Sequence, residues 1–103
     1  MLLGDMQDWK PNVASIIEYA ADIYPESEVV SKLVSGEVHR TNYKEVCVRS
    51  RKLASKLSQD GYKQGDVIAT LALNTFRHLE AYYGVSGMGA VVHTLNFRLH
   101  PCL

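Results

Sequence analysis

Four histidines are the side chains of this chain whose chemistry first suggests a site: His39, His78, His93 and His100. Histidine binds metals and exchanges protons near neutral pH. A metal site needs converging ligands, and no two of these four stand four positions apart, the spacing that places two ligands on one helix face. We therefore expect His93, on a predicted strand, to be a hydrogen-bonded structural residue, with a metal site as the alternative.

A charged cluster at Arg77, His78 and Glu80 offers a second candidate for acid–base chemistry. No nucleophile accompanies it, so a solvated or inter-element polar face is the expected role. The two cysteines, Cys47 and Cys102, are far apart and form no CxxC pair, which favours free thiols, although the sequence does not exclude a disulfide.

Glycines 84, 87 and 89 resemble a nucleotide-binding loop only superficially. Their order is GxxGxG, and they close a predicted helix, whereas a phosphate loop of the type GxGxxG opens one. We expect Gly84 and Gly87 to let the helix approach the sheet closely, and Gly89 to end the helix.

Three aromatic side chains lie within the same predicted helix, which covers residues 75–88. Phe76, Tyr82 and Tyr83 are expected to lie in the core, with a ligand pocket as the alternative. Trp9 and Met6 precede the first predicted helix, where an interaction arm is the alternative to ordinary surface exposure.

Composition restricts the class of protein. Eleven acidic residues balance eleven basic ones, so no basic excess points to nucleic acid or an anionic membrane. A length of 103 residues allows one small domain at most. The N-terminus lacks the pattern of a secretory signal, and the apolar runs are shorter than a membrane span. We therefore expect a cytoplasmic protein.

The elements that hold these residues begin with a helix over 12–24. Asn12 is its predicted cap, Pro25 stops it, and its apolar positions form one stripe: Val13, Ile16, Ile17, Ala20, Ala21 and Tyr24. A β-hairpin follows, with strands at 28–34 and 37–41 around the turn Ser35-Gly36.

The second predicted helix begins after Asn42, which is spaced from Glu45 as in a reciprocal capping box, and it ends at Gly61. Its buried stripe is expected to comprise Val46, Cys47, Ser50, Leu53, Ala54 and Leu57. Its basic residues are expected to face water: Arg49, Arg51, Lys52 and Lys56.

The last elements predict a right-handed, parallel βαβ unit. Residues 67–73 are nearly all apolar, as in a strand buried on both faces, and Asn74 is the predicted cap of a helix over 75–88. A second strand lies at 90–95, a loop follows at 96–101, and Pro101 suits the start of a further helix. The fold class is therefore α/β, as an incomplete domain with one bare sheet edge.

Three stretches resemble the long-chain and medium-chain fatty acyl-CoA synthetases, which are AMP-forming enzymes of the adenylate-forming superfamily. They are EVVSKL at 28–33 with GEVHRTNYKE at 36–45, GDVIATL at 65–71, and NTFRHLEAYYG at 74–84 with GMGAVVHTLN at 87–96 and Arg98-Leu99. The last is the most specific, and the resemblance extends from about Trp9 onward. The chain departs from the family pattern at Phe97, where proline is usual, and at Cys102, where an acid is common.

The resemblance implies ligation of a fatty acid to CoA through an acyl adenylate, with ATP, Mg²⁺ and coenzyme A as cofactors and substrates, and with AMP and pyrophosphate released. The family also forms homodimers. The family's phosphate loop, adenine and magnesium segment, ribose-binding aspartate and catalytic lysine have no counterpart here. We therefore expect no catalytic, cofactor-binding or metal residue in this chain.

Residues 1–103 are accordingly expected to form an N-terminal fragment of the large AMP-binding domain, with a scaffold role and no activity in isolation. A non-catalytic stand-alone interaction module or truncated gene product is the alternative. A small nucleotide-binding protein unrelated to the ligases is a weaker one, because the turn after Leu73 has no glycine. The acyl chain length preferred and the oligomeric state are left open.

Overall fold

Three helices and four short strands make up the part of the chain that the computed structural model describes, namely Gly4 and residues 8–10, 12–96 and 98–99. Their order confirms the predicted mixed α/β succession of helix, hairpin, helix and strand–helix–strand. The elements are α1 (Ala14–Ile23), β1 (Glu28–Lys32), β2 (Val38–Asn42), α2 (Tyr43–Gln59), β3 (Val67–Thr70), α3 (Phe76–Gly87) and β4 (Val91–Thr94).

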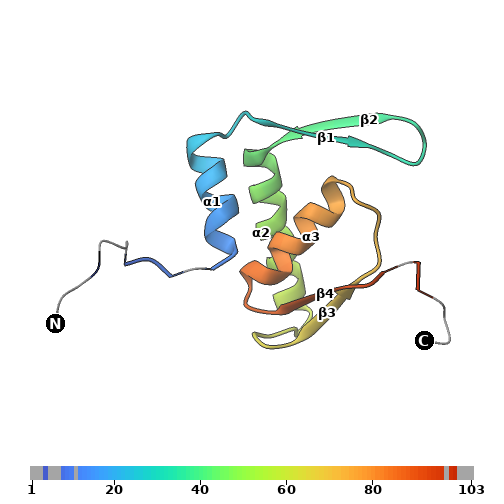
Figure 1. Ribbon diagram of the computed structural model, residues 1–103. Coiled ribbons are helices and arrows are strands. Elements are labelled where there is room, and N and C mark those ends of the chain that lie inside the picture. Colours follow the sequence, from blue (N-terminus) through green and yellow to red (C-terminus); the bar gives the residue numbers. More distant parts are fainter. Residues whose placement is uncertain (1–3, 5–7, 11, 97, 100–103) are drawn as a thin grey trace.

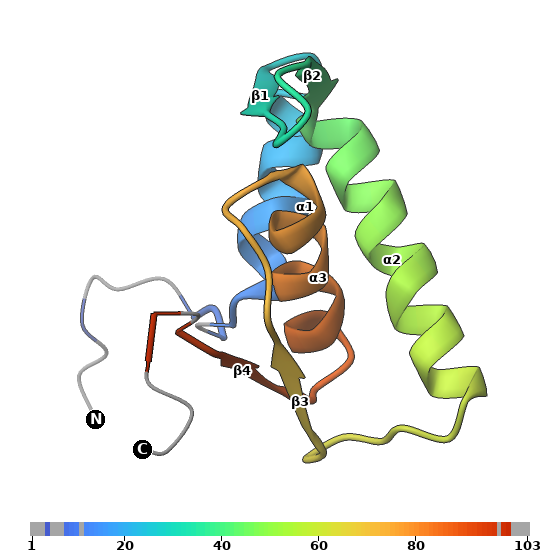
Figure 2. The same cartoon turned by 90° about the vertical axis from the view of Figure 1, so that its right-hand side faces the viewer.

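The helices lie side by side between two small sheets (Figures 1 and 2). The antiparallel hairpin β1–β2 lies at one end of the helices, and the parallel pair β3–β4 lies at the other. Within the described residues no helix has the length and apolar character that a membrane span requires.

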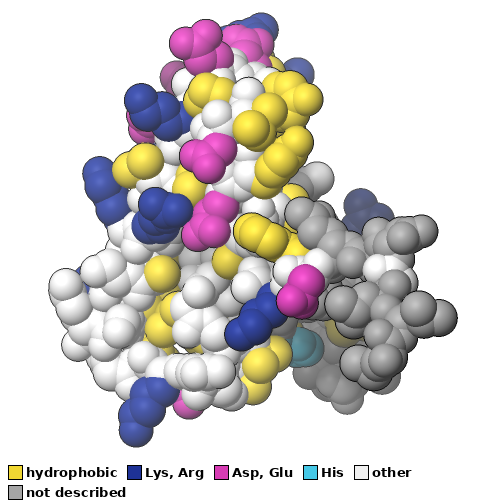
Figure 3. Space-filling model, turned by 90° about the vertical axis from the view of Figure 1, so that its left-hand side faces the viewer, with side chains coloured by type: hydrophobic (Ala, Val, Ile, Leu, Met, Phe, Trp, Pro, Cys, Tyr) yellow, Lys and Arg dark blue, Asp and Glu magenta, His cyan; other side chains and the backbone are white. Residues whose placement is uncertain are grey.

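The core is small, and its main cluster lies where α1 and α2 meet; Phe76 and Val85 of α3 and Ala90 after it are buried as well. Ile17, Val46 and Cys47 are buried together, and half-buried side chains of Ala21, Val29, Tyr43, Leu79 and Tyr83 pack against them. The predicted stripe of α1 is only partly covered, because Ile16 and Tyr24 are 58% and 57% exposed. Helix α1 packs on α2 and α3. In the upper half of the face in Figure 3, apolar side chains gather along the right and basic ones along the left, with acidic side chains between them.

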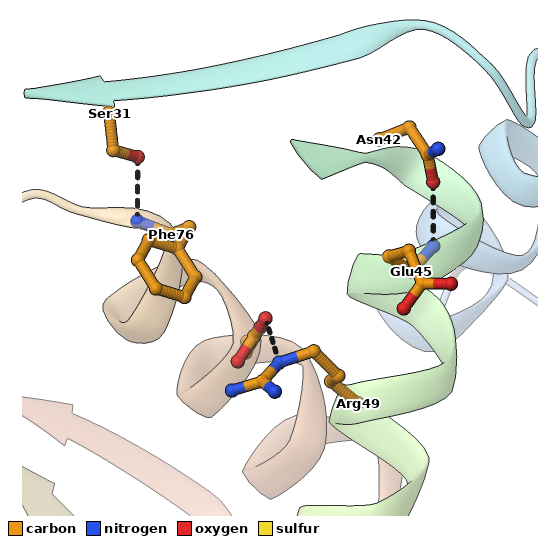
Figure 4. Close-up of polar contacts among 6 residues, drawn as sticks. Ser31, Asn42, Glu45, Arg49 and Phe76 are labelled. Carbon is orange, nitrogen blue, oxygen red and sulfur yellow. Dashed lines mark hydrogen bonds and ion pairs between the residues drawn. The ribbon is translucent and has the colours of Figure 1, made fainter. Parts of the chain in front are cut away.

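The predicted asparagine cap is present at α2, whereas at α1 the N-cap is Val13, without a side-chain capping bond, and Asn12 lies one residue before it. The Oδ1 atom of Asn12 accepts from the N–H of Ser15 at 3.0 Å. The Oδ1 atom of Asn42 accepts from the N–H of Glu45 at 2.9 Å (Figure 4). The reciprocal half of the predicted box is absent from the hydrogen bonds of the described residues, so Asn42 carries the capping role alone.

Asn42→Ala is expected to lower the free energy of unfolding by about 1 kcal/mol, the usual loss when a capping side chain is removed. Asn42→Ser keeps an oxygen acceptor and should stay close to the unsubstituted chain. Urea unfolding followed by circular dichroism measures the free energy of unfolding of both variants. Equal losses of that free energy in Asn42→Ala and Asn42→Ser would show that the capping oxygen contributes nothing.

The parallel pairing of the predicted βαβ unit is confirmed. Strand β3 pairs with β4 in register, with Val67 opposite Val91 and Thr70 opposite Thr94. The predicted burial on both faces is wrong for this structure, because Val67 and Leu71 are 66% and 67% exposed. The apolar run predicted a strand with covered faces, but in the described residues β3 has one partner strand and helix α3 on one side.

Asn74 does not cap α3, contrary to the prediction. The helix begins one residue later than expected, its N-cap Thr75 makes no side-chain bond, and the first helical N–H, that of Phe76, donates to the Oγ of Ser31 on β1 at 2.9 Å. The acceptor comes from a residue 45 positions away, so local spacing did not identify it.

The glycines of α3 approach helices and not the sheet, which corrects a second prediction. A Cβ atom at Gly84 would lie 2.9 Å from the carbonyl oxygen of Ser50 on α2, whereas one at Gly87 would lie 3.9 Å from the Cβ of Ala14 on α1. Gly89 has a φ of +85° after the end of α3, as a helix-ending glycine should.

Candidate functional site

The densest set of polar and aromatic contacts lies where the hairpin, α2 and α3 meet, and we call it the junction: Ser31, His39, Arg49, Phe76 and Glu80. Phe76 is 5% exposed at the first position of α3. Its ring stacks on the imidazole of His39, with centroids 3.8 Å apart and planes at 11°. Together with the Ser31 bond to its N–H, this fixes the start of α3 beneath the hairpin (Figure 4).

An ion pair between α2 and α3 completes the junction. The Nε of Arg49 donates to the Oε1 of Glu80 at 2.7 Å (Figure 4, where the Glu80 carboxylate is unlabelled). The Glu80 side chain is only 8% exposed, while that of Arg49 is 52% exposed. The hydrogen bond to Glu80 and its negative charge raise the pKa of the Arg49 guanidinium above its ordinary value. The buried carboxylate is therefore neutralised by a cation that stays in contact with water.

The predicted cluster at Arg77, His78 and Glu80 is divided among different partners. Glu80 pairs with Arg49, the Nε2 of His78 lies 3.0 Å from the Oγ1 of Thr70, and the guanidinium of Arg77 lies 5.3 Å from the Phe76 ring centroid. The inter-element role is confirmed, and the solvated role is wrong for Glu80, which is buried. Because the three side chains point to separate partners, they form no acid–base site.

The remaining histidines do not converge either. His93 is exposed on β4 and makes no hydrogen bond within the described residues, so the prediction of a hydrogen-bonded structural histidine is wrong. Because β4 belongs to a two-stranded sheet, the face of β4 on which His93 lies is uncovered. His39 belongs to the junction, where its Nδ1 is buried without a hydrogen-bond partner. His100 lies outside the described residues.

Among the described residues, the acidic side chains and the glycines are not arranged as the Mg²⁺ and nucleotide sites that the resemblance implies would need. No group of three or more histidine, cysteine, aspartate or glutamate side chains gathers for a metal in the described part of the chain. Gly84 and Gly87 lie within the second half of α3 and Gly89 follows its end, away from the N-terminus where backbone N–H groups bind phosphate.

The aromatic residues divide between core and surface. Phe76 is buried, Tyr83 is half-buried, and Tyr82 is 38% exposed with its ring edge-on to that of Tyr83 at 5.5 Å. Cys47 is a buried free thiol. Trp9 is 66% exposed and lies beside Ser15, Ile16 and Tyr19 of α1; Met6, Phe97 and Cys102 lie outside the described residues.

Burial raises the pKa of the Tyr83 phenol above its ordinary value, and neighbouring Tyr82 and Tyr43 add smaller contributions in the same direction. The folded chain therefore resists ionisation of Tyr83 more than the unfolded chain does. The resulting stability is present below the unfolded pKa of about 10 and is lost as the pH rises through the folded value.

Tyr83→Phe should consequently show a smaller fall in unfolding free energy than the unsubstituted chain when the pH is raised above about 10. Urea midpoints at neutral pH and above this value give the comparison, with Tyr62→Phe, an exposed tyrosine outside the core, as the matched control. Identical alkaline slopes for Tyr83→Phe and the unsubstituted chain would contradict the expectation.

Two junction residues were not singled out by the sequence. Ser31 lies in the predicted hairpin and is 6% exposed, and Arg49, which is expected to face water, pairs with Glu80 while its side chain stays 52% exposed. The available signal was the period of β1, since Val29 and Ser31 alternate with exposed neighbours and therefore share the inner face.

Comparisons with known proteins agree on one family. A family model described as "AMP-binding enzyme" matches residues 17–101. The chain is 52% identical over 96 residues to a long-chain-fatty-acid–CoA ligase from Thermus thermophilus, covering 93% of this chain and 18% of that protein. It is 49% identical over 98 residues to a medium-chain-fatty-acid–CoA ligase from Ectopseudomonas oleovorans, covering 95% and 18%.

A solved structure supports the fold. The N-terminal domain of FACL13 from Mycobacterium tuberculosis superposes with a TM-score of 0.75 at 24% identity, covering 85% of this chain and 22% of that one. The chain thus corresponds to the N-terminal part of adenylate-forming fatty acid–CoA ligases, and it spans 18% of the length of the two curated relatives.

Proposed function

The chain belongs to the AMP-binding enzyme family, and from this premise we propose that it is an N-terminal structural segment of an ATP-dependent fatty acid–CoA ligase. The reaction of the whole enzyme would convert fatty acid, ATP and CoA into acyl-CoA, AMP and pyrophosphate. The observation that supports the proposal most is sequence identity. Across nearly its whole length the chain is 52% identical to a long-chain ligase and 49% identical to a medium-chain ligase.

The proposed role of this segment is to support the large AMP-binding domain, of which residues 1–103 would be a part. Two pairs of polar side chains that could do chemistry join elements instead, namely Arg49–Glu80 and Thr70–His78. The described residues also offer no cluster for a metal. These contacts support a segment without catalytic, cofactor-binding or metal residues of its own.

The parallel pair β3–β4 would then extend the sheet of that domain. Val67 and Val91 on these strands are 66% and 51% exposed, and Leu71, which follows β3, is 67% exposed. Apolar strands of a parallel sheet are ordinarily covered on both faces. Further strands and helices of the same domain would supply that cover, and ATP, Mg²⁺ and CoA would bind to them.

The proposal is tested by complementation. The Thermus thermophilus ligase would be prepared without the part that this chain matches, and the 103-residue chain would be added to it. Acyl-CoA formation from a long-chain fatty acid should require both pieces. Activity of the shortened ligase that does not change when the chain is added would contradict the scaffold role.

A stand-alone interaction module is the second candidate, favoured by the same exposed strand pair. Unpaired N–H and C=O groups on a sheet edge bind another strand. Light scattering distinguishes the interaction module from the structural segment. A module of this kind would form a defined complex with a full-length relative. A chain that stays monomeric in that mixture would count against the module. A homodimer and a cytoplasmic location stay predictions.

A further inference from the structure

A hollow of about 140 Å³ opens where α1, α2 and α3 meet, at the side of the core away from the junction. Its lining is mostly apolar and includes Ala14, Ile17, Cys47, Ser50, Ala54 and Gly87. Glu18 and Arg51 also line it, and they form an ion pair of 3.3 Å in which both side chains are more than half exposed. Exposed pairs of this kind contribute little to stability, so this pair can separate at little cost.

The hydroxyl group of Ser50 is buried and finds no hydrogen-bond partner in the part of the chain that the structure describes. Ser50 is 3% exposed, and its Oγ bonds to none of these residues. A helical serine often donates to the carbonyl four residues earlier, here Val46, and that bond is not made. Leaving a buried hydroxyl unpaired is unfavourable, because the group loses its hydrogen bonds to water and gains none in the protein. The partner that Ser50 lacks can come from the hollow that its side chain lines.

We propose that this three-helix hollow is a binding site for a small ligand that combines an apolar ring with a hydroxyl group, with the size and chemistry of phenol. The size agrees, because a cavity of about 150 Å³ lined by aliphatic side chains holds benzene. The ring would pack on Ala14, Ile17 and Ala54, and the hydroxyl would exchange a hydrogen bond with the Oγ of Ser50.

Water satisfies the hollow less well than such a ligand. An ordered water needs two to four polar partners. Ser50 is the buried lining residue with a strong hydrogen-bonding group; the other polar lining residues are the half-buried Tyr83 and the exposed pair Glu18–Arg51, which bond to each other. The site is separate from the proposed scaffold role, since it lies among the helices and not on the open strand pair. A ligand that binds only the folded chain would also stabilise it.

The test is a titration of the 103-residue chain with phenol, and with toluene as the probe without a hydroxyl group, followed by amide chemical shifts in NMR spectra. Phenol should produce saturable shifts at Ala14, Ile17, Ser50 and Gly87. It should bind roughly fivefold more tightly than toluene, the effect of one net hydrogen bond.

Ser50→Ala should remove this preference and leave toluene binding unchanged. The variant should fold, because it deletes an unpaired buried hydroxyl and not a bonded one. Ser55→Ala, on the exposed face of the same helix, is the matched control and should keep the preference.

Three results would overturn the proposal. The first is the absence of saturable shifts at the hollow, which would leave water as its occupant. The second is equal affinity of phenol and toluene in the unsubstituted chain, a comparison that needs no variant. The third is an unchanged preference for phenol in Ser50→Ala.

Discussion

Gly84→Ala is expected to lower the free energy of unfolding by roughly 2 kcal/mol, in the range found for overpacked cores. The new Cβ atom would lie 2.9 Å from the carbonyl oxygen of Ser50 and 3.2 Å from a methyl group of Leu53. The first neighbour is backbone inside α2, so the two helices would have to separate. This loss exceeds the gain of about 1 kcal/mol that alanine brings to a helix interior.

Gly87→Ala is the matched control on the same helix. Its Cβ atom would meet only the Cβ of Ala14, at an ordinary contact distance of 3.9 Å. Neither glycine has a positive φ, so the gain in helix propensity should appear as a stabilisation of up to about 1 kcal/mol. Urea unfolding of both variants measures the difference, and equal effects at the two positions would contradict close packing of α3 on α2.

Arg49→Met is expected to cost about 2 kcal/mol of unfolding free energy. Breaking a buried pair costs about 3–5 kcal/mol because an uncompensated charge stays behind. The lower figure applies here because Arg49 is 52% exposed and only Glu80, at 8%, is desolvated. Removal of the guanidinium leaves the buried carboxylate without a partner between α2 and α3.

The double variant Arg49→Met with Glu80→Met should recover most of that loss, because it removes the unpaired charge as well. Arg51→Met is the matched control, since its partner Glu18 is 54% exposed, and it should change stability by less than about 1 kcal/mol. The account of the junction would be wrong if Arg49→Met and Arg51→Met had the same small effect, or if the double variant were no better than Arg49→Met.

The features that depend on near neighbours in the chain were predictable. The order of elements, the capping of α2 by Asn42 and the helix-ending conformation of Gly61 follow from short-range rules of helix initiation and termination. The parallel pairing of β3 and β4 also follows, since a helix between two apolar strands places them side by side.

The features that depend on tertiary packing were not predictable. Arg49 and Glu80 are 31 positions apart, and Ser31 and Phe76 are 45 apart, so no local pattern links them. The same limit applies to Gly84, whose close approach to Ser50 depends on how α3 crosses α2. An apolar run such as 67–73 predicts a buried strand, but it does not say which elements cover it.

The family assignment rests on strings of residues and not on a constellation of catalytic side chains. The resemblance predicted a fatty acyl-CoA synthetase, and the family match with relatives at 52% and 49% identity confirms it. In the most specific string, Glu80, His78 and Phe76 join α3 to other elements.

The most direct test of the scaffold role is an assay of AMP release by the 103-residue chain alone, supplied with a long-chain fatty acid, ATP, Mg²⁺ and coenzyme A. The proposal predicts no AMP above a control without protein, together with restored release when the remainder of the Thermus thermophilus ligase is added. Release of AMP by the chain alone would contradict it, because catalytic groups would then have to lie within these residues.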